Sequence, residues 1–262
     1  MKFLLSEMTW KDAENAFKTT DVAIIPVGCM HAHGTVCPIG VDLMIVDELA
    51  KRVGSRTGAI VVPAVPYGWA NFQMDFPGSI TVDRAHIYGM IMDVCRSLHK
   101  WGIRKLLFLS GHGENFGALK EVIMDSREEL GQFSVLVEWW MLVKELDPKF
   151  EETFNVEPAL SAVINPKLVD LTKAKMRKIK HAAFLPDSLT PVNLRQIRFR
   201  KGTVDASLRA RDVEGEGESF SQAAVDAMLK DGREILERLV DYLAHLVEAL
   251  SKVKSGQRCD LF

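Results

Sequence analysis

Four short apolar segments, each followed by a polar or aromatic loop, constrain the fold of this chain more than any other feature. They occupy residues 22–27, 59–65, 104–110 and 133–138. Uninterrupted hydrophobic runs are typical of parallel strands that are covered on both faces. Helical periodicity separates them, at residues 43–52, 84–100 and 116–130. The alternation predicts an α/β fold with a mostly parallel sheet and right-handed crossovers.

Local signals predict where several helices begin and end. Thr81 or Asp83 can cap the second helix, and Gly131 can end the third. Residues 220–253 form a long amphipathic pattern that predicts a core-facing helix with a weak point at Gly232. The acidic, glycine-rich segment 212–219 has neither the lysine of a phosphate-binding loop nor the spacing of a calcium loop. We interpret it as a solvated turn.

Charge and composition exclude several classes of partner. A formal net charge of −2 provides no positive field to gather nucleic acid or anionic lipid. No run approaches a membrane span, and the apolar run at residues 3–5 is too short for a signal peptide. Four cysteines in a chain of this length do not resemble a disulfide framework. We expect a cytoplasmic protein that folds as one domain over residues 1–262, with neither a nucleic-acid nor a membrane partner.

Histidines and carboxylates gather in the loops after two of the predicted strands. His31 and His33 follow the first strand, and His112 and Glu114 follow the third. Residues i and i+2 of an extended chain project to the same side, and parallel strands end at one edge of the sheet. Asp42, at the start of the following helix, adds a carboxylate. Together these groups predict a site for Zn²⁺, Mn²⁺, Fe²⁺ or Co²⁺.

Aromatic residues in the same loops predict a pocket with flat apolar walls, suited to a ring-shaped or planar substrate. The candidate substrate-binding residues are Trp69, Phe72, Gln73, Trp139, Trp140 and Gly113. Neighbouring strand residues face opposite sides, so we expect at most one of Trp139 and Trp140 to touch the substrate.

The same segments resemble the creatininase (creatinine amidohydrolase) family. IPVGCMHAHGTVCPIGVD at 25–42 follows the family pattern of P-x-G, E-x-H-G, a proline and an aspartate ligand. VPYGWANFQMDFPGSIT at 65–81 is similar to its Y-G loop and F-P-G-T, and SGHGEN at 110–115 to its N-G-H-x-x-N. Weaker agreement continues through 157–170.

The resemblance implies a three-layer α/β/α subunit, often hexameric, that uses one or two divalent metals to activate water and open a cyclic or acyclic C–N bond. It places His33, Asp42, His112 and Glu114 at ligand positions, with Asp42 bridging two metals. We therefore expect a metal-dependent hydrolase, a homo-oligomer acting on a small polar substrate.

The departures from the family pattern carry information of their own. His31 replaces the family's glutamate, Val36 its second histidine, and Phe72 and Gln73 a Glu-His pair. The loss of one negative charge predicts weaker binding of a second metal, or a single metal. An imidazole-rich ligand set favours zinc over manganese and magnesium. We therefore do not assign creatinine as the substrate.

The expected mechanism uses a metal-activated water against a carbonyl-type carbon. Glu114 or Glu152 can carry the proton; Glu152 takes the spacing of the family's catalytic histidine. A carboxylate beside a cation has a lowered pKa, so Glu152 is favoured if Glu114 is a ligand. Asn115 and the backbone amides of Gly113 and Glu114 can hold a developing oxyanion.

Other interpretations stay open. The family also includes hydrolases that cleave a C–C bond of a keto-cyclitol ring and others that remove formyl groups from a nucleotide precursor. No basic triplet lies beside the motifs, so ring opening ranks above deformylation. A metal-binding paralogue without catalysis is a further alternative. Cys29 or Cys37 can act as a nucleophile, but low-pKa thiolates usually lie at helix N-termini. Cys37 fits better as an additional soft metal ligand.

Overall fold

The computed structural model describes residues 2–146 and 156–254. Its central layer is a parallel sheet in the order β2-β1-β3-β4. The strands are β1 (Val22–Val27), β2 (Ile60–Val61), β3 (Lys105–Ser110) and β4 (Phe133–Glu138). Three of them end in register, because Val27 lies beside Ser110 and Ser110 beside Glu138. β2 is shorter than predicted, since Pro63 has no N–H to donate to a neighbouring strand.

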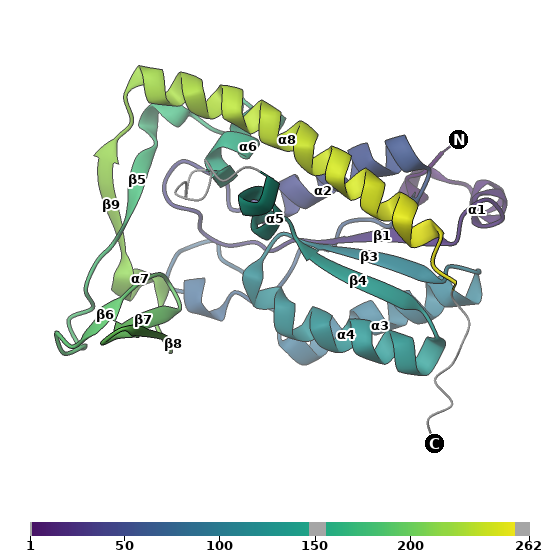
Figure 1. Ribbon diagram of the computed structural model, residues 1–262, viewed down its shortest axis with the longest axis horizontal. Coiled ribbons are helices and arrows are strands. Elements are labelled where there is room, and N and C mark those ends of the chain that lie inside the picture. The colour runs from purple at the N-terminus through teal and green to yellow at the C-terminus, as the bar shows by residue number, and fades with distance from the viewer. Residues whose placement is uncertain (1, 147–155, 255–262) are drawn as a thin grey trace.

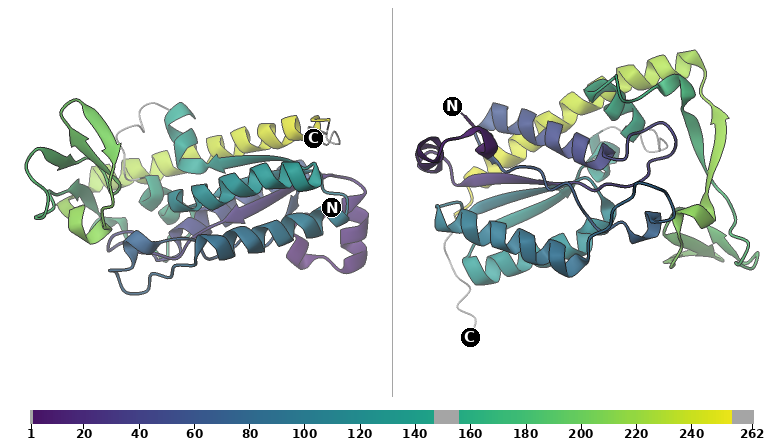
Figure 2. Two further views of the ribbon diagram at one scale, coloured as in Figure 1. Left: turned by 90° about the horizontal axis from the view of Figure 1, so that it is seen from below. Right: turned by 180° about the vertical axis from the view of Figure 1, so that it is seen from behind.

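Helices cover both faces of this sheet (Figures 1 and 2). One face carries α3 (Arg84–Lys100) and α4 (Phe116–Leu130). The other carries α2 (Val41–Thr57), α5 (Trp139–Leu146), α6 (Val156–Ile164) and α8 (Gln222–Ser251). Alternate residues of β1 belong to the two cores: Ile24 packs with α2 and α8, and Ile25 with α3. The predicted α/β fold with three layers is confirmed.

The connections around β1 and β3 create a crevice at the carboxyl edge of the sheet. The chain leaves β1 for α2 on one face and leaves β3 for α4 on the other. The strand order therefore reverses between two adjacent strands. In open parallel sheets, ligands bind outside the carboxyl ends of the strands at such a reversal. The loops that carry His31, His33 and His112 begin at this point.

Helix ends largely follow the sequence signals. The Asp83 side chain accepts a hydrogen bond from Ala85 N–H and caps α3. Gly131 ends α4 with φ 67°, a left-handed conformation that favours glycine. The remaining short helices are α1 (Trp10–Phe17), α7 (Ala210–Val213) and the 3₁₀ turns Leu5–Glu7, Asn71–Gln73, Gly113–Asn115 and Leu171–Lys173.

α8 is one continuous helix whose apolar side faces the core, as predicted. The predicted weak point at Gly232 is wrong. A Cβ at Gly232 would stand 2.9 Å from the Ala159 carbonyl oxygen of α6. The glycine thus permits close contact between two helices and does not interrupt α8.

Residues 175–219 form an antiparallel unit, here called the arm, that lies beyond the carboxyl ends of the central strands (Figure 1). Its strands are β5 (Lys175–Ile179), β6 (Leu189–Pro191), β7 (Gln196–Phe199), β8 (Gly202–Asp205) and β9 (Glu214–Ser219). The solvated turn predicted at 212–219 is wrong: β9 pairs with β5. Lys175 supports the pairing by binding Glu216 across the two strands at 2.6 Å.

Within residues 2–146 and 156–254, no helix combines the length and the apolar character needed to cross a membrane.

Candidate metal centre

Two glycines allow the first turn of α2 to enter the crevice between the loops after β1 and β3. A Cβ at Gly28 would lie 2.5 Å from the Cα of Leu43, and one at Gly111 would lie 2.3 Å from the backbone oxygen of Asp42. Neither position has room for a side chain. This close approach places the Asp42 carboxylate between the histidines of the two loops.

Asp42 is buried, and each of its oxygens faces imidazole nitrogens. Oδ2 lies 2.9 Å from His31 Nε2 and 3.2 Å from His112 Nδ1. Oδ1 lies 2.9 Å from His33 Nε2. The two nitrogens that face Oδ2 are themselves 2.9 Å apart. Ligands bound to one ion at about 2.0–2.2 Å stand about 3 Å from one another, so His31, His112 and Asp42 already have the spacing of a chelate.

Backbone carbonyls fix the orientation of all three imidazoles. His31 Nδ1 donates to the Ala32 carbonyl, His33 Nδ1 to the His31 carbonyl and His112 Nε2 to the Trp69 carbonyl. A carbonyl only accepts, so each of these nitrogens carries a proton, and the inner nitrogens of His31 and His112 turn a lone pair toward Asp42.

The inner nitrogens of His31 and His112 and Oδ2 of Asp42 are therefore electron-pair donors that converge on one place. Asp42 Oδ2 has no hydrogen-bond partner among the described residues, although two ring nitrogens lie near it. Buried acceptors that face one another without a donor are costly. A cation between them would satisfy all of these atoms, so the donor set fits a divalent metal.

Burial and mutual contact shift the pKa values of His31, His33 and Asp42. Burial lowers the pKa of His31 to about 4. Burial also opposes a charge on His33, but the Asp42 carboxylate outweighs it and raises the pKa of His33 to about 9. Burial acts to raise the pKa of Asp42, yet the charge on His33 and the imidazoles around the carboxylate hold it well below its usual range. The carboxylate thus stays ionised and attracts positive charge.

The structure adds two candidate ligands that the sequence analysis did not select. Cys29, His31, Asp42 and His112 form one group whose ligand atoms all lie within 4.8 Å of one another. His33, Asp42 and Glu157 form a second such group. Asp42 belongs to both groups, and the bridging role that the resemblance implies for it stays a prediction. The only signal for Glu157 was the weaker agreement with the family at 157–170.

Glu114 joins neither group among the described residues. Its carboxylate pairs with Arg195 at 2.9 Å and with Arg84 at 3.5 Å. The sequence spacing predicts that His112 and Glu114 project to the same side of an extended chain. This is wrong because a 3₁₀ turn begins at Gly113, immediately after the extended His112. The side chains of His112 and Glu114 therefore diverge. Glu152, the other predicted proton carrier, lies outside the described residues.

Asn115 connects three loops through its buried side-chain amide. The side chain is fully buried. Its Oδ1 accepts from Trp69 N–H at 3.1 Å, and its Nδ2 donates to the Gly28 carbonyl at 3.0 Å. Asn115 thus joins the loops that follow β1, β2 and β3, and its predicted oxyanion role stays a prediction.

Of the aromatic residues predicted to line the pocket, two lie at the site and two pack in or against the core. Phe72 stacks on His112, with ring centroids 6.0 Å apart. The Trp69 ring lies 3.7 Å from the guanidinium of Arg84. Trp139 is 1% exposed and packs in the core, with Trp140 partly buried against the same cluster. Both begin α5, so the strand geometry assumed for them does not apply.

Two other predicted substrate-binding residues lie near this region. Gln73 is buried, and its Oε1 has no hydrogen-bond partner among the described residues. A Cβ at Gly113 would lie 3.1 Å from the guanidinium of Arg195. Arg195 and Arg84 are the basic groups that the sequence analysis did not find. Arg195 comes from the arm, which the sequence patterns did not reveal.

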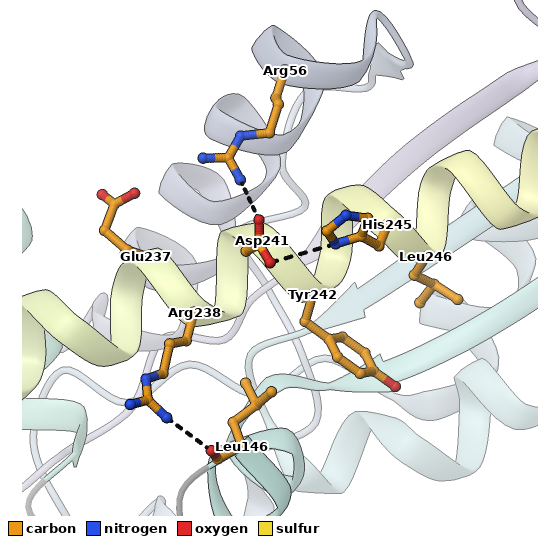
Figure 3. A pocket seen from close by; sticks show the side chains of 8 residues that line it. All are labelled: Arg56, Leu146, Glu237, Arg238, Asp241, Tyr242, His245 and Leu246. Atoms are coloured by element: carbon orange, nitrogen blue, oxygen red, sulfur yellow. Dashed lines mark hydrogen bonds and ion pairs between the residues drawn. The ribbon is translucent and has the colours of Figure 1, made fainter.

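A hollow of about 830 Å³ lies elsewhere, between α2, α5 and α8 (Figure 3). Its charged groups contact one another or the backbone: Asp241 contacts Arg56 at 3.2 Å and His245 at 3.5 Å, and Arg238 donates to the Leu146 carbonyl. It contains no member of either ligand group. The chemistry of the chain therefore lies in the crevice and not in this hollow.

Comparison with known proteins agrees with the geometry. A family profile described as creatinine amidohydrolase (creatininase) matches residues 6–247. The chain belongs to the creatininase family. It is 30% identical to creatinine amidohydrolase of Pseudomonas putida over 238 residues, which are 81% of this chain and 90% of that protein. This creatininase-family chain is accordingly an enzyme, a metal-dependent hydrolase.

Two further comparisons extend the relationship. A 3-dehydro-scyllo-inosose hydrolase of Thermotoga maritima is 32% identical over 110 residues, 42% of this chain and 35% of that protein. A solved creatininase with manganese has a TM-score of 0.72 and 25% identity, and the match covers 97% of this chain and 100% of that one. The resemblance stated from the motifs is confirmed, as is the creatininase fold.

Proposed function

We propose that this creatininase-family enzyme hydrolyses a C–N bond in a cyclic or acyclic amide of a small polar substrate, with zinc as the first choice of metal. The supporting observation is the convergence of inward-facing nitrogens of His31, His33 and His112 on both oxygens of buried Asp42. A divalent metal bound there supplies a nucleophilic water at neutral pH and polarises a carbonyl oxygen.

The chain's own residues would hold the metals, orient the imidazole rings and exclude bulk water. His31, His112 and Asp42 would hold one metal, and His33, Asp42 and Glu157 a second. The backbone carbonyls behind the three imidazoles keep the rings in the ligating orientation. Phe72 covers His112 and limits access of bulk water.

The choice of zinc rests on the ligand types. Imidazole suits zinc, whereas oxygen-rich sets suit manganese and magnesium, and this chain has His31 where the family pattern has a carboxylate. Solved creatininases include a manganese form and a Zn–Zn type. Manganese, iron and cobalt are the alternatives that elemental analysis distinguishes.

The rim of the crevice supports a planar, polar substrate. Arg84 lies over Trp69, and Arg195 reaches Glu114 from the arm. Guanidinium groups recognise carbonyl and carboxylate oxygens, and the flat ring of Trp69 suits a planar group. Deformylation of an anionic precursor ranks below ring opening in the sequence analysis because no basic triplet lies beside the motifs. Arg84 and Arg195 supply positive charge at the rim, so that reason no longer applies.

Hydrolytic ring opening of a keto-cyclitol is the second candidate. The similarity to 3-dehydro-scyllo-inosose hydrolase favours it. We also propose a cytoplasmic homo-oligomer, a hexamer by family resemblance, which the particle mass in solution tests. The three described cysteines are free thiols, in accord with a reducing compartment.

Metal removal and ligand substitution test the hydrolase assignment. The purified protein is analysed for metals, then stripped by a chelator, reloaded and assayed on lactams, formamides and keto-cyclitols. We expect activity to disappear with the metal and return with zinc. Asp42→Asn and His112→Ala should each lower activity by more than about 100-fold, because each removes a ligand.

His245→Ala is the matched control, since His245 lies on α8, in the hollow away from the crevice. It should leave activity unchanged. Hydrolysis that is indifferent to chelation and to both ligand substitutions would contradict the proposal.

A further inference from the structure

Cys29 lies among the candidate metal ligands and not in a hydrophobic core. It is the second residue after β1 and is fully buried. Cys95 is equally buried but packs with the apolar residues of α3 and α4. Cys29 belongs to none of the hydrophobic clusters among residues 2–146 and 156–254. Its sulfur instead lies within 4.8 Å of ligand atoms of His31, Asp42 and His112.

The two ligand groups differ in their number of donors. Within residues 2–146 and 156–254, the group with Cys29 offers four side chains, and the group with His33 and Glu157 offers three. Zinc sites with four protein ligands are closed and structural, whereas catalytic sites have three protein ligands and keep one position for water or substrate. The donor count therefore assigns different tasks to the two positions.

We propose that Cys29 is a metal ligand, so that Cys29, His31, His112 and Asp42 enclose one zinc ion completely. Substrate then binds at the second position, formed by His33, Asp42 and Glu157. This inference rests on the proposed metal-dependent function and refines it. It transfers the soft-ligand role expected for Cys37 to Cys29, because Cys37 belongs to neither ligand group.

The chemistry of the thiol agrees with this role. Cysteine binds zinc as the thiolate. On binding, the S–H bond breaks, a sulfur–metal bond forms and the proton leaves to solvent. A thiolate also restores the negative charge that His31 removes from the family's ligand set. Soft thiolate selects zinc over manganese.

Cobalt substitution tests the sulfur bond without reference to activity. The metal-free protein is titrated with Co²⁺ and followed by absorption spectroscopy. A thiolate ligand gives a sulfur-to-cobalt charge-transfer band in the near ultraviolet. We expect this band in the wild-type protein and in Cys37→Ser, a control in the same loop. Cys29→Ser should bind cobalt, as its visible d–d bands show, but lack the charge-transfer band.

X-ray absorption at the zinc edge gives a second measurement that needs only the wild-type protein. With one equivalent of zinc, we expect a sulfur neighbour at about 2.3 Å besides nitrogen and oxygen neighbours at about 2.0–2.2 Å. A wild-type protein that binds cobalt and zinc with nitrogen and oxygen neighbours alone would overturn the role of Cys29 and leave the proposed function intact. Failure to bind either metal would overturn both.

Discussion

At the scale of single residues, Asp42 organises the centre by presenting its two oxygens to two different groups of donors. Oδ2 faces His31 and His112, and Oδ1 faces His33. No imidazole needs a side-chain partner to be oriented, because backbone carbonyls hold the outer nitrogens. The ligands are thus preorganised by the path of the loops.

Asn115 holds those loops together and gives a residue-scale prediction. Asn115→Ala removes the partners of Trp69 N–H and of the Gly28 carbonyl and leaves both groups unsatisfied in the interior. Each unsatisfied group costs about 1–3 kcal/mol. We expect the free energy of unfolding to fall by about 2–6 kcal/mol in urea denaturation, together with weaker zinc binding.

Asn15→Ala is the control for this prediction. Asn15 is exposed on α1, which lies at the end of the sheet opposite the loops of the centre (Figure 1), and its replacement should change stability by less than about 0.5 kcal/mol. A stable Asn115→Ala variant with unchanged zinc affinity would show that the loops are held by other contacts.

At the scale of elements, the close contact of α6 with α8 connects the core to the metal centre. α6 carries Glu157, and Gly232 of α8 lets the backbone of α6 approach at Ala159. A change of packing between these two helices would therefore move a candidate ligand.

Gly232→Ala tests this contact. Its Cβ would stand 2.9 Å from a backbone oxygen that cannot rotate away, so we expect a loss of about 1–3 kcal/mol. Gly89→Ala in α3 is the matched control, because a Cβ there meets nothing within 4 Å. Alanine is the better helix former, so the control should gain up to about 1 kcal/mol. Equal urea midpoints for the two variants would refute the contact.

At the scale of the whole molecule, the arm forms one wall of the crevice through polar contacts. Arg195 binds Glu114, Arg209 binds Asp75 at 3.0 Å, and Thr35 donates to Glu216 at 3.3 Å. Exposed pairs of this kind contribute about 0.2–1 kcal/mol each and weaken with salt. The arm therefore has its own small core but a weak attachment at the rim.

Hydrogen exchange tests this attachment. In the double variant Arg195→Ala and Arg209→Ala, we expect faster exchange in β7 and β8, while the melting temperature falls by no more than about 4 °C. The control changes Arg198 and Lys201, exposed on the same hairpin, to alanine. Unchanged exchange in the first variant would mean that other contacts hold the arm.

The sequence by itself determined the α/β order, the limits of α3 and α4 and four side chains of the centre. Burial on both faces imposes continuous apolar runs, and such runs are visible in a single chain. His31, His33, Asp42 and His112 could be selected because strands of a parallel sheet deliver their following loops to one edge.

Only the tertiary structure decided which groups complete the centre. Glu157 and Arg195 come from segments more than 100 residues beyond Asp42 in the chain, and no local pattern encodes their approach. The 3₁₀ turn at Gly113 directs Glu114 to the arginines, and α5 begins early enough to bury Trp139. Ligand geometry depends on backbone contacts such as those at Gly28 and Gly111, where a single Cβ would not fit. Periodicity fixes which side of an element is buried, whereas these contacts fix which side chains meet.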